Sequence, residues 1–291
     1  MMSSSVSSQQ VSRFDLGSFS VNRLGFGAMQ LAGPGVFGPP RDRPEALAVL
    51  RAAVEGGVDH IDTAQYYGPD VVNELIREAL HPYPPGLAIV TKLGARRDKQ
   101  GGILLYDEPD QLRAGLEENL ASLGVDRLAA ANLRLVDGAP ADTRFDNQLA
   151  ALVKARDDGL IAGVGLSNIT VDHLLRALEA TEIVCVQNLF NLADLSSLPV
   201  LQQCTARGIA FVPFFSLGSG MRGSNRVLGD PRVRAVAARL GATPAQIALA
   251  WALDYAPNLL LIPGTASRGH LAENLAAASV VLDDAARREL R

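Results

Sequence analysis

Short apolar runs alternate with longer amphipathic stretches along most of the chain. Each run is about five residues long, is often β-branched and is followed by a small or polar residue, as is typical of a buried strand. We expect strands at Arg23–Gly27, Val58–Asp62, Leu87–Lys92, Leu128–Leu133, Ile161–Leu166, Ile183–Gln187, Ile209–Pro213 and Leu259–Ile262.

The stretches between these runs carry the start and stop signals of helices. Pro44–Glu55 begins with proline and is followed by two glycines, and leucines at helical spacing precede Gly124. Pro231 and Pro244 begin two further helices, and Ser267–Ala278 supplies the last.

About eight alternations of strand and helix imply parallel strands, because each helix then serves as a crossover. A closed (β/α)8 barrel and an open doubly wound sheet both fit. The intervals are even and no linker interrupts them, so we expect a single α/β domain, a TIM barrel, over residues 13–291. The alternation in Phe14–Val21 predicts a small N-terminal β-hairpin at the barrel floor, and the serine-rich residues 1–12 predict a flexible tail.

The composition is that of a globular protein, with 48% hydrophobic and 20% charged residues and a mean hydropathy of +0.13. No apolar run approaches the ~18 residues of a membrane span. The net charge of −4 comes from well-mixed acidic and basic residues, which argues against a nucleic-acid partner. Cys185 and Cys204 are too few for a disulfide framework, and no Cys/His spacing predicts a metal site. We expect a cytoplasmic protein.

Polar residues gather where the second, third and fourth strands end, which is where the active site of such a barrel lies. Asp62 and Tyr67 follow the second strand, Lys92 ends the third, and Asn132 and Arg134 lie at the end of the fourth. A cation lowers the pKa of a tyrosine from its usual value of about 10, and a carboxylate can hold that cation. This set suits proton donation to a carbonyl oxygen while hydride reaches the carbon.

Five short motifs occur in order along the chain: Asp62-Thr63-Ala64-x-x-Tyr67-Gly68, Thr91-Lys92, Gly165-Leu166-Ser167-Asn168, Val186-Gln187-Asn188 and Ile262-Pro263-Gly264-Thr265. Together they resemble the aldo-keto reductase family, from about residue 23 to residue 278. The resemblance implies a (β/α)8 barrel, NADPH bound without a Rossmann motif, and reversible reduction of aldehydes or ketones. Tyr67 would be the proton donor, tuned by Lys92 and Asp62; Tyr66 is a competing phenol that the family spacing disfavours.

The fourth strand departs from the family pattern, because Arg134 stands where the family usually has histidine. A guanidinium only donates hydrogen bonds, so it could orient the carbonyl but cannot shuttle protons. Arg134 either tunes an active enzyme or marks an NADPH-binding regulatory or redox-sensing protein with little turnover. A third alternative is an alcohol or sugar dehydrogenase of the same family. Asn132 shares a strand face with Arg134 and is a candidate substrate contact.

Two segments of the chain narrow the resemblance to one branch of the family. Residues 25–38, together with Asn132-Leu133-Arg134, resemble the branch of the family that contains bacterial pyridoxal reductases. This implies reduction of pyridoxal to pyridoxine with NADPH, so the expected partner is a small-molecule aldehyde. The sequence leaves the oligomeric state open.

The resemblance also implies which residues bind the cofactor. The nicotinamide would be approached by Gly27, Ala28 and Met29, its carboxamide by Ser167, Asn168 and Gln187, and its ring face by Phe214. The pyrophosphate would lie on Ser216, Leu217, Gly218 and Ser219, and the adenine would meet Glu273 and Asn274. The start of the last helix, which suits an anion, contains or follows Gly264, Thr265, Ser267, Arg268 and His270. The family often has lysine and arginine where Gly264 and His270 stand, which weakens the expected grip on a 2′-phosphate. Arg268 could offset this, and we expect NADPH rather than NADH.

Overall fold

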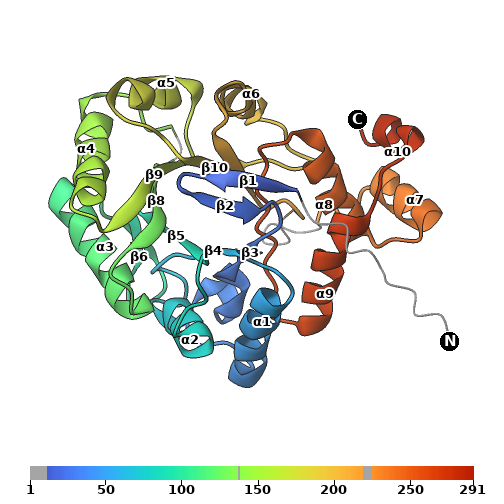
Figure 1. Ribbon diagram of the computed structural model, residues 1–291, viewed down its shortest axis with the longest axis horizontal. Coiled ribbons are helices and arrows are strands. Elements are labelled where there is room, and N and C mark those ends of the chain that lie inside the picture. Colours follow the sequence, from blue (N-terminus) through green and yellow to red (C-terminus); the bar gives the residue numbers. More distant parts are fainter. Residues whose placement is uncertain (1–11, 137, 219–224) are drawn as a thin grey trace.

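The computed structural model describes residues 12–136, 138–218 and 225–291. Seven parallel strands form a curled sheet in the order β11-β10-β9-β8-β5-β4-β3 (Figure 1). They are β3 (Phe26–Gly27), β4 (His60–Asp62), β5 (Ala88–Leu93), β8 (Leu128–Arg134), β9 (Ile161–Ser167), β10 (Cys185–Leu189) and β11 (Ala210–Phe214).

The predicted eighth strand closes the barrel through isolated bridges. Leu261 pairs in parallel with Leu24, and Leu259 pairs in parallel with Phe211, so this segment joins the two edges of the sheet. The backbone N–H of Leu261 donates to the carbonyl of Arg23 at 2.8 Å. The α/β barrel predicted from the sequence is confirmed, with its last strand reduced to bridges.

Helices surround the barrel (Figure 1). They are α1 (Arg43–Glu55), α2 (Val71–Leu80), α3 (Pro109–Leu123), α4 (Thr143–Asp157), α5 (Val171–Ala180), α6 (Leu198–Arg207), α7 (Pro231–Leu240), α8 (Pro244–Tyr255), α9 (Arg268–Ala276) and α10 (Asp284–Glu289), with 3-10 turns η1 (Ala28–Leu31), η2 (Pro34–Val36) and η3 (Ala277–Ser279). Asp42, Asp230 and Thr243 cap α1, α7 and α8 with their side chains, and each of these helices has a proline in its first turn, where a missing N–H is tolerated.

The N-terminal hairpin forms as predicted, from β1 (Arg13–Leu16) and β2 (Phe19–Asn22). Leu16 and Val21 are buried against small residues inside the barrel, among them Ala88 and Ala210, which lie near the start of their strands. The hairpin therefore plugs the amino-terminal end of the barrel. Of the predicted tail, residues 1–11 lie outside the described residues.

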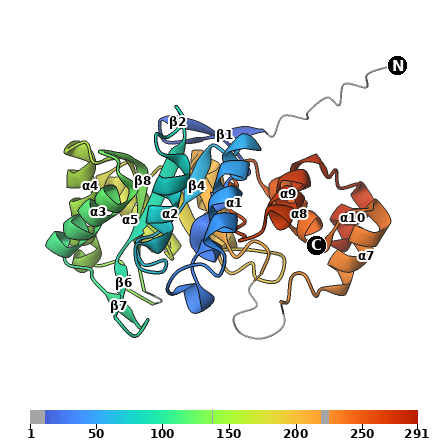
Figure 2. The ribbon, with the colours of Figure 1, turned by 90° about the horizontal axis from the view of Figure 1, so that it is seen from below.

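A second hairpin, which the sequence analysis did not predict, follows β5. It consists of β6 (Ala95–Arg97) and β7 (Ile103–Leu105), and Figure 2 shows it at the opposite end of the molecule from β1 and β2. Arg97 donates hydrogen bonds to the carbonyls of Gly101 and Gly35, at 2.6 and 3.2 Å, and so ties this hairpin to η2. It extends from the carboxyl ends of the barrel strands.

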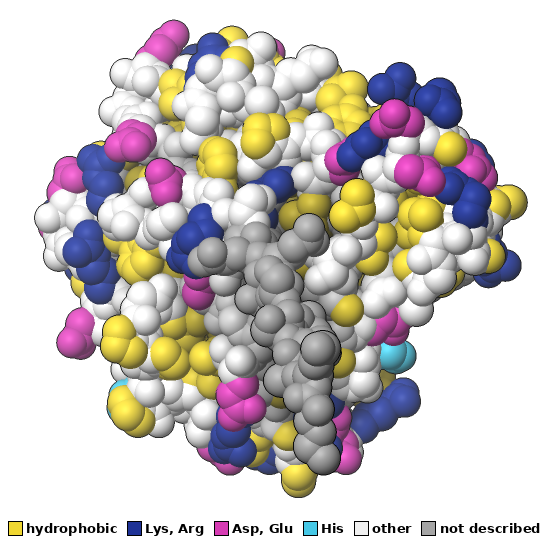
Figure 3. All heavy atoms as spheres, turned by 45° about the vertical axis from the view of Figure 1, so that its right-hand side comes forward, with side chains coloured by type: hydrophobic (Ala, Val, Ile, Leu, Met, Phe, Trp, Pro, Cys, Tyr) yellow, Lys and Arg dark blue, Asp and Glu magenta, His cyan; other side chains and the backbone are white. Residues whose placement is uncertain are grey.

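The surface agrees with the mixed charge of the sequence. On the face drawn in Figure 3, acidic and basic side chains are interspersed. None of the described helices is long and apolar enough to cross a membrane.

Candidate active site

A buried ion pair lies where β4 and β5 end. Lys92 Nζ is 2.5 Å from Asp62 Oδ1, and each side chain is only 6% exposed. The same ammonium donates to the carbonyl of Thr63 at 3.1 Å, and Gln187 Nε2 donates to Asp62 Oδ2 at 2.8 Å. Both carboxylate oxygens are thus held. Because each charge is desolvated, removal of either partner would leave an uncompensated buried ion.

The phenol of Tyr67 lies beside this pair. Its side chain is buried, and Lys92 Nζ is 5.2 Å from its ring centroid. Burial raises the pKa of Tyr67 well above the usual value for tyrosine; Tyr66 and Asp62 raise it further, and Arg134 opposes them. Tyr67 is therefore protonated at neutral pH and has a proton to give.

This corrects the expectation that the nearby cation lowers the pKa of Tyr67. In the structure the loss of solvation of a buried phenolate outweighs the opposing effect of Arg134 on the pKa of Tyr67. A tyrosine in this environment suits the role of an acid better than that of a base.

Arg134 reaches Tyr67 through its neighbour. The guanidinium carbon of Arg134 is 5.7 Å from the ring centroid of Tyr66, a cation–π arrangement. The rings of Tyr66 and Tyr67 meet edge to face, with centroids 4.8 Å apart. From the sequence Tyr66 is only a competing phenol, because the spacing of the motif does not indicate that it lies between Arg134 and Tyr67.

Asn132 is enclosed below the rim. Its side chain is fully buried, and its Oδ1 accepts from Cys185 Sγ at 3.3 Å. A Cβ atom on Gly165 would lie 2.0 Å from the same oxygen, so glycine there makes room for the amide. A direct contact between Asn132 and a substrate stays a prediction, and it requires this side chain to become accessible.

The residues expected to bind the nicotinamide and pyrophosphate lie at the same end of the barrel, because parallel strands bring their carboxyl ends to one rim. Gly27 ends β3, Ala28 and Met29 lie in η1, Ser167 ends β9, Asn168 follows it, Gln187 lies in β10, Phe214 ends β11, and Ser216, Leu217 and Gly218 come next. Ser219 lies outside the described residues.

One side-chain atom in this group is a buried hydrogen-bond acceptor. Gln187 Oε1 is buried and has no partner among the described residues, while the other end of the amide is held by Asp62. Ser167 lies next to Gln187 across the sheet, because Gln187 pairs in register with it. An amide N–H of a ligand would satisfy this oxygen if the side chain became accessible to it, so the contact with a carboxamide stays a prediction. Phe214 is half-buried.

The segment before α9 accounts for one departure from the family. A Cβ atom on Gly264 would lie 2.2 Å from the carbonyl oxygen of Gly27, so the close approach of these two backbones leaves no room for the lysine common in the family. Ser267 N donates to Thr265 Oγ1 at 3.1 Å and precedes the helix. Within α9, His270 is exposed, Glu273 is half-buried and Asn274 is buried.

Arg268 is already engaged by a carboxylate. Its backbone N–H donates to Glu45 Oε1 at 3.0 Å, and its Nε donates to Glu45 Oε2 at 2.9 Å. Glu45, in the first turn of α1, therefore occupies the backbone N–H and one guanidinium donor of Arg268, the residue expected to strengthen the binding of a 2′-phosphate.

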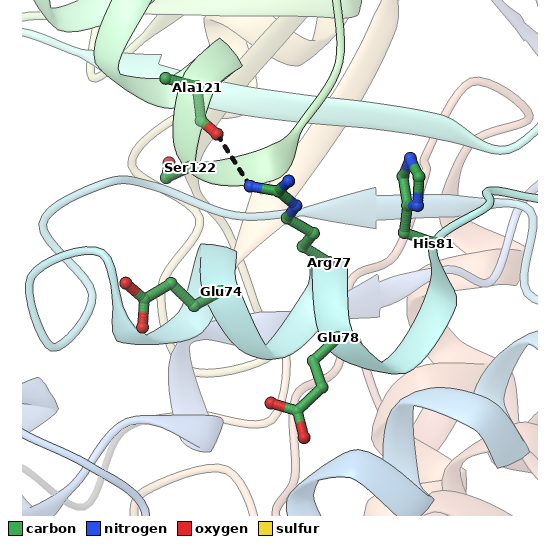
Figure 4. Close-up of a pocket in the computed structure, with 6 residues that line it drawn as sticks. All are labelled: Glu74, Arg77, Glu78, His81, Ala121 and Ser122. Atoms are coloured by element: carbon green, nitrogen blue, oxygen red, sulfur yellow. Dashed lines mark hydrogen bonds between the residues drawn. The ribbon is translucent and has the colours of Figure 1, made fainter.

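A surface cavity of about 540 Å³ lies away from the strand ends, between α2 and α3. Figure 4 shows the residues that line it, with Arg77 donating to the carbonyl of Ala121 at 3.5 Å. None of the predicted site residues lines it. Among the described residues, no group of three or more His, Cys, Asp or Glu side chains is arranged to hold a metal ion.

The sequence is similar to known proteins along most of its length. Residues 23–291 match the aldo/keto reductase family. The chain is 48% identical over 274 residues to pyridoxine 4-dehydrogenase of Escherichia coli (strain K12), covering 93% of this chain and 94% of that protein.

Solved structures show the same fold. A thermostable aldo-keto reductase, Tm1743, solved with the inhibitor epalrestat, superposes with a TM-score of 0.80 at 27% identity and covers 96% of this chain and 98% of its own. An aldo/keto reductase from Klebsiella pneumoniae, solved with NADP and acetate, superposes with a TM-score of 0.76 at 23% identity over 93% and 90% of the two chains. With a buried Asp–Lys pair beside a tyrosine at the rim of such a barrel, and with a match over nearly its whole length, the chain belongs to the aldo/keto reductase family.

Proposed function

We propose that the protein reduces an aldehyde to an alcohol with NADPH, and that pyridoxal, reduced to pyridoxine, is its substrate. The observation that carries the proposal is Tyr67, kept protonated by burial beside the Asp62–Lys92 pair at the barrel rim. The choice of substrate rests on the 48% identity to pyridoxine 4-dehydrogenase. Oxidation of pyridoxine to its aldehyde and reduction of pyridoxal are one reaction in two directions.

The residues at the rim fit the cofactor. Gln187 Oε1 has no partner among the described residues and would take a hydrogen bond from the carboxamide once it is accessible, and Phe214 would offer its ring to the nicotinamide. The same cofactor is bound in the Klebsiella pneumoniae relative of this fold. When bound, NADPH supplies the hydride for the carbonyl carbon.

The chain itself supplies the proton. The hydroxyl of Tyr67 would donate its proton to the carbonyl oxygen as negative charge develops there. Lys92 would stabilise the phenolate that remains, and Asp62 holds Lys92 in place. Arg134, which contacts the Tyr66 ring, adds positive charge near the same phenol and would orient a polar aldehyde.

The test is consumption of NADPH by the purified protein with pyridoxal, with benzaldehyde as a comparison and chromatographic identification of pyridoxine. We expect turnover with a higher kcat/KM for pyridoxal. Binding of NADPH without turnover of either aldehyde would overturn the proposal and favour the regulatory alternative. Faster oxidation of alcohols or sugars than reduction of pyridoxal would favour a dehydrogenase.

A further inference from the structure

Two buried asparagines join the ends of β4 and β5 to the helices outside them. Thr63 Oγ1 donates to Asn73 Oδ1 at 2.8 Å, and Thr91 Oγ1 donates to Asn119 Oδ1 at 2.6 Å. The asparagines are joined in turn, since Asn73 Nδ2 donates to Asn119 Oδ1 at 3.1 Å. All four side chains belong to residues with 0% exposure. The four residues form one chain of hydrogen bonds, which we call the threonine–asparagine network.

The two threonines are the chain neighbours of the ion pair. Thr63 directly follows Asp62, and Thr91 directly precedes Lys92. Side chains alternate across a strand, so Asp62 and Lys92 meet inside the barrel while the threonines turn outward to α2 and α3. The network thus fixes, from outside the barrel wall, the two backbone positions that carry the pair.

Two further hydrogen bonds hold the amide nitrogens of the network. Asn73 Nδ2 donates to Ser122 Oγ at 3.0 Å, and Asn119 Nδ2 donates to the carbonyl of Gly115 at 2.7 Å. A buried network in which each amide nitrogen and oxygen has a partner favours one arrangement of its members over nearby alternatives. It ends at Ser122, which lines the surface cavity of Figure 4.

We infer that Asn73 and Asn119 are positioning residues of the proposed active site. They hold the ends of β4 and β5 at the spacing that keeps Lys92 paired with Asp62 and beside Tyr67. The inference rests on the proposed function for its kinetic consequences, but the placement of Lys92 is measurable without turnover.

The first comparison is Asn119→Ala with Asn258→Ala. Asn258 is equally enclosed, 1% exposed, and its Nδ2 donates to the carbonyl of Ile209 at 2.8 Å, near the amino-terminal end of the barrel. Both variants lose a buried amide, so both should lower the Tm. Only Asn119→Ala should reduce kcat, by about tenfold or more, because a small displacement of a reacting group is costly. The KM for NADPH should stay within about twofold.

A pair of variants at Thr91 separates positioning from packing. Thr91→Val keeps the shape and removes the hydroxyl, so it should lower kcat like Asn119→Ala. Thr91→Ser keeps the hydroxyl and should restore most of the rate. Equal kcat values for the two variants would contradict the inference.

Lys92 can also be observed directly, because the chain has three lysines, and the other two, Lys99 and Lys154, are exposed. In protein labelled with 13C at lysine Cε, the resonance of Lys92 should move in Asn119→Ala and stay in place in Asn258→Ala. An unmoved resonance together with wild-type kcat would overturn the inference. If the wild type reduces no aldehyde, the proposed function fails, and this resonance alone decides between a displaced and an undisplaced Lys92.

Discussion

At the scale of single residues, the chemistry depends on burial more than on the sum of nearby charges. Tyr67 is surrounded by a cation, a carboxylate and a second phenol, yet desolvation is the largest influence on its pKa. A raised pKa keeps the hydroxyl of Tyr67 protonated at neutral pH, so it can donate a proton during reduction of a carbonyl. The reverse oxidation needs the phenolate, so its rate should rise with pH throughout the range in which the protein is folded.

Glu45 sets a prediction about the cofactor. Its carboxylate holds the backbone N–H and the Nε of Arg268, so it competes with a 2′-phosphate for these donors and repels its charge. In Glu45→Gln the ratio of the Kd for NADH to the Kd for NADPH should rise about fivefold, equivalent to about 1 kcal/mol. Quenching of Trp251, the one tryptophan, measures both constants. Glu55→Gln, at the other end of α1, is the control; an unchanged ratio in Glu45→Gln would contradict this reading.

The candidate catalytic residues could be proposed from sequence because strand ends and motif order place them. Partners contributed by distant segments could not. Nothing in the chain near Arg268 indicates that it meets Glu45, 223 residues away. Likewise, Gln187 reaches Asp62 across the barrel, a contact that depends on closure of the sheet.

At the scale of elements, the two hairpins have different roles. Leu16 of β1 is buried inside the barrel floor, whereas Leu104 of β7 is 43% exposed at the other end. Leu16→Ala should lower the free energy of unfolding by about 2–5 kcal/mol and leave the Kd for NADPH unchanged. Leu104→Ala should change the stability by less than about 0.5 kcal/mol. Urea unfolding and cofactor titration check both; a weakened Kd in Leu16→Ala would show that the floor hairpin acts on the site.

Strands and helices with a strong local pattern of apolar and polar residues were predictable, and those with a weak pattern were not. In the floor hairpin, apolar and polar residues alternate on both sides of the turn, so the sequence predicts it. The residues of β7 are apolar but exposed, so no in–out alternation marks them as a strand. Leu259–Ile262 reads as a strand because it is buried, although its pairing is limited to bridges at Leu259 and Leu261.

At the scale of the whole molecule, burial in the closed core keeps the two cysteine thiols in their neutral form. Burial raises the pKa of Cys185 and of Cys204 from 9.0 to about 12. Above a pH of about 9 the unfolded chain releases these protons while the folded protein keeps them, so stability falls as pH rises toward 12. Each thiol lowers the free energy of unfolding by up to about 1.4 kcal/mol per pH unit in this range.

This pH dependence is measurable by urea unfolding at a series of pH values between about 8 and 11. A variant carrying both Cys185→Ala and Cys204→Ala should be less stable at neutral pH because of the cavities, but its stability should fall less steeply with pH. An unchanged slope would mean that other groups account for the alkaline loss.

The central claim is that Tyr67 gives the proton, and the most direct measurement compares the rate of pyridoxal reduction by NADPH in Tyr67→Phe and Tyr66→Phe. The two phenols are adjacent and their rings touch, so the variants are closely matched. Tyr67→Phe should lose more than about a hundredfold in kcat, and Tyr66→Phe less than about tenfold. Near-normal turnover in Tyr67→Phe, or a larger loss in Tyr66→Phe, would contradict the account.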